Sequence, residues 1–142
     1  MYFPLVVLAQ KEKTWIEASL DAKLNLRANL AKAGVPVKSP VMRSHEKAVP
    51  MSANIKGWDQ LVLTASGTSD GTAQDWSAFV NARLIKEDGS VVWLDELEPA
   101  YQKTGYDQVY KNIGVFGNPL VIGGKKYDHG IFCHADALVI YN

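Results

Sequence analysis

Short apolar runs separated by turn residues dominate the chain after residue 50. Leu61–Ala65, Phe79–Ile85 and Val91–Leu94 are rich in the branched and aromatic side chains that favour β-strands. The tetrapeptide Glu87–Ser90, with Asp-Gly at its centre, is typical of a tight hairpin turn between two strands. No helix-spaced run alternates with these strands, so the pattern predicts an antiparallel β-sandwich rather than a parallel α/β sheet.

The C-terminal stretch continues the same pattern. Leu120–Ile122 and Ala137–Tyr141 predict the last strands, with turns at Gly123-Gly124 and around Gly130. Since no helical pattern follows Gly123-Gly124, we interpret the glycine pair as a hairpin turn and not as a phosphate-binding loop.

One segment near the N-terminus has helical periodicity instead. Residues 14–33 begin with a capping box, in which Thr14 and Glu17 can satisfy first-turn amides. Gly34 then favours termination of the helix. The apolar stripe includes Leu20, Leu24 and Leu30. The spacing therefore predicts one amphipathic helix over residues 14–33.

The length of 142 residues suits about one domain with its own hydrophobic core. We expect residues 1–36 to form an N-terminal strand and helix, and residues 37–142 to form the β-sandwich. Residues 2–9 are apolar, and two interpretations of them stay open: a short strand, or the remnant of an export signal.

Composition argues against several kinds of partner. Lys plus Arg and Asp plus Glu number 15 each, so there is no electrostatic reason to expect binding to nucleic acid or to an anionic membrane. No run reaches the ~18 apolar residues of a membrane helix. Cys133 is the single cysteine, which excludes an intrachain disulfide. Its apolar neighbours favour a small buried core residue over a reactive thiol.

The C-terminal segment reads NPLVIGGKKYDHGIFCHADALVIYN and resembles the opening third of the NPCBM family, a carbohydrate-binding module also classed as family 51. The matching residues are Asn118, Pro119, Leu120, Gly123, Gly124, Tyr127, Gly130, Ile131, His134, Ala135 and Tyr141. Trp93–Leu97 is similar to an earlier part of the same opening. Residues 89–142 therefore resemble the start of such a module.

Residues 55–85 resemble the closing third of the same family. The matching residues are Gly57, Leu61, Leu63, Asp70, Gly71, Asp75, Trp76, Asn81, Ala82, Arg83 and Leu84. Residues 37–88 thus resemble the end of a module and precede its start. Two interpretations stay open: the chain is cut from a tandem array, or the two parts pack together as a permuted sandwich.

The resemblance implies a jelly-roll β-sandwich of the galactose-binding-like type. It implies non-catalytic carbohydrate binding, with a galactose-type glycan as one ligand class, by a module or part of a module of a larger extracellular or periplasmic glycan-processing protein. Strands absent from the reversed order would leave an unpaired sheet edge, which either the helix covers or another chain completes. Of these two interpretations, we expect that a second polypeptide or an oligomer completes the sheet. The alternative function is a structural or assembly domain completed by another polypeptide.

Sugar binding by such a module needs an aromatic surface for the sugar's C–H face and polar side chains for its hydroxyls. The family-like segments supply Asp75, Trp76 and His134 for this role, and Tyr106 lies in a polar, glycine-containing connection that favours exposure. Trp76 and His134 are also consistent with core packing. Asp70 either hydrogen-bonds its own turn or binds a structural calcium, which prefers oxygen ligands.

Catalysis has little support in the sequence. Asp95, Glu96 and Glu98 are close in sequence, but nothing fixes two of them across one glycosidic bond. No nucleophile elbow, P-loop or metalloprotease motif is present. The sequence therefore predicts that this chain is not an enzyme, although a larger glycoside hydrolase could contain it as a segment.

Overall fold

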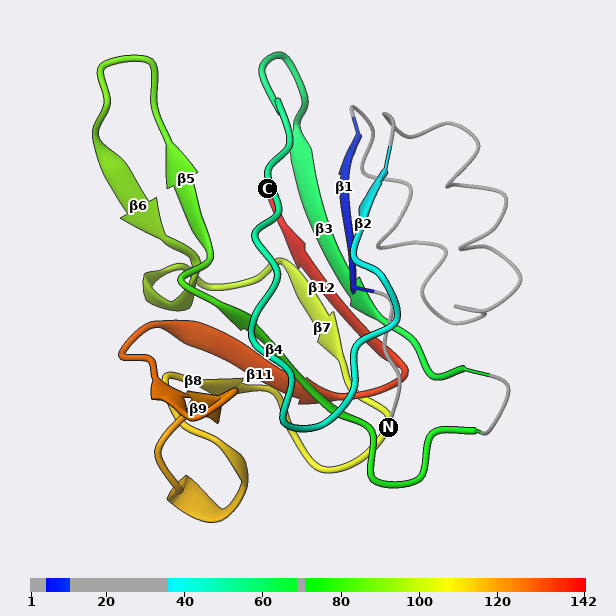
Figure 1. The fold of residues 1–142 in the computed structure, drawn as a ribbon. Helices are drawn as coiled ribbons and strands as arrows, with labels where there is room; N and C mark the ends of the chain where they lie inside the picture. Colours follow the sequence, from blue (N-terminus) through cyan, green and yellow to red (C-terminus); the bar gives the residue numbers. More distant parts are fainter. Residues whose placement is uncertain (1–4, 11–35, 69–70) are drawn as a thin grey trace.

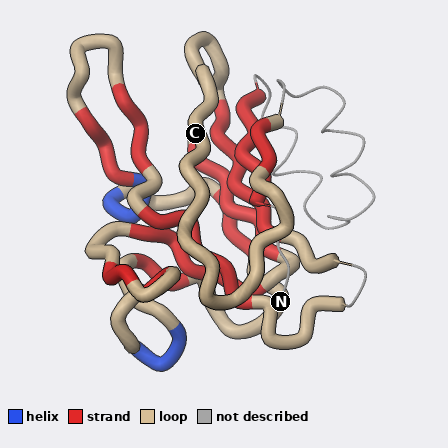
Figure 2. Tube along the Cα trace, in the orientation of Figure 1, coloured by secondary structure: helices blue, strands red, loops and turns tan. Residues whose placement is uncertain are grey.

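The computed structural model describes residues 5–10, 36–68 and 71–142 (Figure 1). The predicted helix over residues 14–33 and the proposed calcium ligand Asp70 lie outside the described residues. The described part is mostly β, and every strand pairing in it is antiparallel, as the sequence predicts. Helical structure in this part consists of two short 3-10 turns, η2 at Leu94–Glu96 and η3 at Val115–Gly117 (Figure 2).

The larger sheet has five strands in the order β2-β1-β3-β12-β7. Their bounds are Leu5–Gln10 for β1, Val37–Lys38 for β2, Gln60–Ala65 for β3, Tyr101–Lys103 for β7 and Ala137–Tyr141 for β12. All residues of β3 and β12 are buried, because these central strands are covered on both faces. Both apolar runs are thus confirmed as strands, and β1 is the strand that one interpretation of the N-terminal run predicts.

The smaller sheet has three strands in the order β4-β11-β8. Their bounds are Trp76–Val80 for β4, Tyr110–Lys111 for β8 and Gly130–His134 for β11. Burial alternates along β4, with Ser77 and Phe79 buried and the other three residues partly exposed. This period of two places Trp76, Ala78 and Val80 on the outer face of the sheet.

Two hairpins complete the described strands. One joins β5 (Arg83–Ile85) to β6 (Val91–Trp93), and the other joins β9 (Val121–Ile122) to β10 (Lys125–Lys126). Gly89 turns the first hairpin with a φ of 82°, and Gly123 and Gly124 turn the second with φ of 55° and 78°. These left-handed conformations suit glycine, so both predicted turns are confirmed.

One hydrophobic core joins the two main sheets. Leu63 of β3 and Val139 of β12 belong to the same buried cluster as Phe79 of β4 and Ile131 of β11. Cys133 is also in this cluster and is fully buried, as its apolar neighbours predict. The core therefore fixes the inner faces of both sheets and leaves the outer face of β4-β11-β8 for other roles.

The structure corrects one predicted boundary and refines another. The run Phe79–Ile85 is not one strand, because Asn81 adopts a φ of 52° and separates β4 from β5. The turn expected around Gly130 is a bend at residues 128–129, and Gly130 itself begins β11. A Cβ on Gly130 would lie 2.5 Å from Leu120 Cδ2, so close packing rather than turn geometry explains this glycine.

Candidate functional site

Three of the residues singled out in the sequence form one cluster of rings. Trp76 and His134 are cross-strand partners on β4 and β11, and their ring centroids lie 5.0 Å apart at 89°. Tyr106 lies 6.2 Å from Trp76 and 5.9 Å from His134. Segments far apart in sequence therefore converge at one end of the smaller sheet.

The connection between β7 and β8 holds Tyr106 in this position. Gly105 donates its N–H to the carbonyl of His134 at 3.0 Å. The hydroxyl of Thr104 accepts the His134 N–H at 2.9 Å and donates to the His134 carbonyl at 3.0 Å. A Cβ on Gly105 would overlap the Ala135 carbonyl, so only glycine lets the connection approach β11 this closely.

The imidazole of His134 is oriented by the backbone. Its Nδ1 lies 2.6 Å from the carbonyl oxygen of Ala135, and that oxygen can only accept a hydrogen bond. This contact favours the tautomer protonated at Nδ1, in which Nε2 is a hydrogen-bond acceptor. With an exposed fraction of 8%, His134 combines a packing role with one acceptor near the ring cluster.

The aromatic rings differ in how much surface they leave open. Trp76 stacks on Phe132 with centroids 5.2 Å apart and planes 5° apart, so one face of the indole is covered. Tyr106 is 66% exposed and is the most open ring of the cluster. The geometry thus supports stacking on Tyr106, with Trp76 as a side wall.

Asp75, which directly precedes Trp76, is buried rather than exposed. The residue is 4% exposed, and its carbonyl accepts the Ala135 N–H at 2.8 Å. A Cβ on Gly67 would come within 3.2 Å of its Oδ2, which shows how closely the loop packs on this carboxylate. Asp75 therefore positions the start of β4, and its carboxylate is not part of the open surface.

The family model of the NPCBM/NEW2 domain matches residues 30–85 and 90–142, which together make up most of the chain. The chain belongs to the NPCBM/NEW2 domain family. This membership identifies a carbohydrate-binding module family and confirms the resemblance seen in the sequence. No curated protein and no solved structure matches the chain.

The NPCBM/NEW2 domain places two further aromatic residues beside the cluster. Phe132 lies between Trp76 and Tyr110, whose ring is 6.3 Å from that of Phe132. The phenol of Tyr110 donates to Asp107 Oδ2 at 2.6 Å, and this hydrogen bond raises the pKa of Tyr110. The alternation of side chains along β11 places Phe132 on the same face as His134, so the sequence could have indicated Phe132. The position of Tyr110 follows only from the register of β8 with β11.

A second polar cluster of the NPCBM/NEW2 domain lies at η2. Oδ2 of the buried Asp95 accepts hydrogen bonds from Asn112 Nδ2 and pairs with His129 Nδ1, each at 2.9 Å. Trp93 stacks on the His129 ring at 4.0 Å. These contacts tie η2 to the loops before β9 and β11, so we assign the cluster a structural role.

Two features of the described residues concern metal and membrane binding. No group of three or more His, Cys, Asp or Glu side chains there is arranged to hold a metal ion. No helix in that same part of the chain has the length and apolar character needed to cross a membrane.

Proposed function

We propose that the chain binds carbohydrate without catalysis, through the surface formed by Tyr106, Trp76 and His134. The observation that carries the proposal is the exposed Tyr106 ring, held beside an imidazole acceptor in a domain of a carbohydrate-binding family. The finer parts of the proposal are a galactose-type glycan as ligand, an extracellular or periplasmic location, and a larger glycan-processing protein around the module.

The chemistry of the surface fits a neutral sugar. The Tyr106 ring can stack on the apolar C–H face of a pyranose, and Nε2 of His134 can accept a hydroxyl hydrogen. Trp76 limits lateral movement because it lies edge-on to Tyr106 at 83°. The formal net charge of zero fits an uncharged ligand without selecting one.

The first test is a glycan array probed with the intact, folded chain, followed by calorimetric titration with galactosides. The proposal expects saturable binding to at least one glycan class, with galactosides among the binders. If folded protein binds no glycan at all, the proposed function is wrong. If it binds other sugars but no galactoside, only the ligand class is wrong.

Two expectations about the domain remain proposals as well. We propose that the two sheets form a jelly-roll sandwich of the galactose-binding-like type.

We also propose a structural calcium in the loop that contains Asp70. A bound calcium stabilises the native state, so EDTA should lower the Tm. A melting curve that EDTA leaves unchanged removes the calcium proposal.

A second candidate function is an assembly role in which another polypeptide completes the sandwich. One specific observation favours it. The strand β4 is at the edge of its sheet, so its outer side pairs with no other strand of the described chain.

A further inference from the structure

The outer side of β4 carries backbone groups that no described residue satisfies. The Asp75 carbonyl accepts the Ala135 N–H, and the Asn81 N–H donates to the His129 carbonyl at 2.9 Å. Because hydrogen-bonded pairs alternate along an antiparallel ladder, the odd-numbered residues between them, Ser77 and Phe79, also bond to β11. The N–H and C=O groups of Ala78 and Val80 therefore point away from β11. Among the described residues, no backbone or side-chain hydrogen bond reaches them.

This edge lacks the features that usually protect an edge strand. The sequence of β4 is Trp-Ser-Ala-Phe-Val, with no charged residue and no proline. Edge strands in folded proteins commonly contain a lysine, a proline or a bulge that prevents pairing, because an open edge pairs readily with another chain. The composition of β4 is instead that of a strand with neighbours on both sides.

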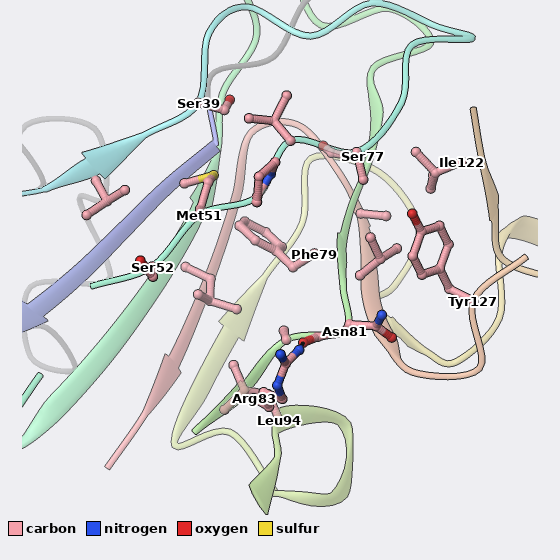
Figure 3. Close-up of a pocket in the computed structure, with 18 of the residues that line it drawn as sticks. Ser39, Met51, Ser52, Ser77, Phe79, Asn81, Arg83, Leu94, Ile122 and Tyr127 are labelled. Atoms are coloured by element: carbon pink, nitrogen blue, oxygen red, sulfur yellow. Dashed lines mark hydrogen bonds between the residues drawn. The ribbon is translucent and has the colours of Figure 1, made fainter. Parts of the chain in front are cut away.

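An open gap lies beside β4 (Figure 3). It has a volume of about 1520 Å³, and all five residues of β4 line it. Its walls are mostly apolar, with Phe79 and Leu94 from the core side and Met51 from the loop before β3. Pockets for small ligands measure roughly 300–1,000 Å³, so this gap has the room for an extended peptide.

The loop over residues 39–59 borders the gap but does not pair with β4. Among the described residues, its backbone hydrogen bonds include local ones from Glu46 to Arg43 and from Trp58 to Ile55, and none of those bonds reaches β4. On the far side of the gap, the loop packs closely against Gly123. A Cβ added to Gly123 would lie within 3.0 Å of backbone atoms of Glu46 and Lys47. The loop thus frames the gap and leaves the edge of β4 unsatisfied.

The charged residues around the gap are mainly basic. The basic ones are Arg43, Lys56, Arg83, Lys86 and Lys125. The acidic ones are Glu46 and Glu87, and Glu87 is paired with Lys56. A segment with acidic residues beside its apolar ones would complement this lining.

We infer that the edge of β4 is a binding site for an extended segment of a second polypeptide, which adds to the sheet as a further strand. The segment pairs its backbone with Ala78 and Val80, places alternate apolar side chains into the gap and carries acidic residues at its flanks. Strand addition of this kind takes its affinity from the main chain and its specificity from side-chain pockets. The site rests on the assembly role proposed above, and it shares one residue, Trp76, with the outer-face cluster around Tyr106.

The test uses the full chain as bait for a displayed library of random peptides, about twelve residues long so that each can span a strand. We expect enriched peptides with alternating apolar residues and more Asp and Glu than Lys and Arg. The best peptide is then titrated against Ala78→Pro, which removes the outward N–H. Its Kd should rise by about tenfold or more.

Val91→Pro is the matched control. The N–H of Leu94 donates to the Ala82 carbonyl, and the N–H of Lys86 donates to the Ser90 carbonyl. In the alternating pattern that these hydrogen bonds set, the Val91 N–H of the edge strand β6 also points outward. Val91 does not line the gap, so this variant should keep the Kd within about twofold of the unaltered chain.

Hydrogen exchange on the unaltered chain decides the question even if Ala78→Pro fails to fold. The amides of Ala78 and Val80 should exchange quickly in the free chain and slowly with the peptide bound. Those of Ser77 and Phe79, which bond to β11, should be slow in both. The inference is overturned if no peptide is enriched, or if a bound peptide leaves the Ala78 and Val80 amides unprotected. A concentration-dependent dimer without peptide binding would also overturn it, by making a second copy the occupant.

Discussion

At the residue scale, the position of the candidate sugar-binding ring depends on a backbone contact that tolerates no side chain. Gly105 packs against the peptide group between Ala135 and Asp136, and Tyr106 comes directly after Gly105. The sequence indicated Tyr106 by its polar, glycine-containing surroundings. It did not indicate why glycine is needed, because the contact joins residues about thirty positions apart.

Gly105→Ala should lower the free energy of unfolding by about 1–3 kcal/mol, since the added methyl overlaps the Ala135 carbonyl and forces a backbone shift. Gly114→Ala is the control, because a Cβ there meets nothing closer than 3.6 Å and the backbone conformation is an ordinary one. Urea unfolding of both variants measures the difference. Equal stability of the two would contradict the packing described for Gly105.

The thiol of Cys133 should be inert in the folded chain. Burial raises the pKa of Cys133 to about 12, so the thiolate that reacts with labelling reagents is scarce. Ellman's reagent at pH 8 should label the chain only after denaturation. Above the ordinary thiol pKa of 9.0, the Cys133 thiol of the unfolded chain loses its proton while that of the folded chain keeps it. The free energy of unfolding should therefore fall as the pH rises past 9.0. Rapid labelling of native protein would contradict the burial.

At the element scale, local signals were sufficient for some strands and turns and insufficient for others. The runs in β3 and β12 and the Asp-Gly hairpin were predictable because their signals lie within a few residues. The break at Asn81 and the start of β11 at Gly130 were not, because each depends on packing against a distant segment. The contribution of Tyr110 required the register of β8 with β11.

Central and peripheral strands should differ sharply in their tolerance of truncation. Ile140→Ala in β12 removes a side chain that is 0% exposed and should cost about 2–5 kcal/mol. Val121→Ala in β9 alters a residue that is 52% exposed and should change stability by about 0.5 kcal/mol or less. Thermal or chemical denaturation checks both. A small loss for Ile140→Ala would contradict the central position of β12.

At the scale of the whole molecule, two antiparallel sheets share one core and leave two distinct surfaces. The outer face of the smaller sheet presents the aromatic cluster, and its β4 edge borders the open gap. The family and the antiparallel β class could be predicted from the sequence. The burial of the Asp75 carboxylate and the partial covering of Trp76 could not, because both depend on how segments from different parts of the chain pack.

The central claim is that Tyr106 binds sugar, and calorimetric titration of a matched pair of variants tests it most directly. Tyr106→Ala removes the exposed ring of the cluster, whereas Phe116→Ala removes a ring that is 87% exposed on η3. With a glycan that binds the unaltered chain, Tyr106→Ala should weaken binding by about tenfold or more, as expected for the loss of an aromatic contact of ~1.5 kcal/mol. Phe116→Ala should leave the Kd unchanged. Unaltered affinity in folded Tyr106→Ala, or an equal loss in both variants, would contradict the account.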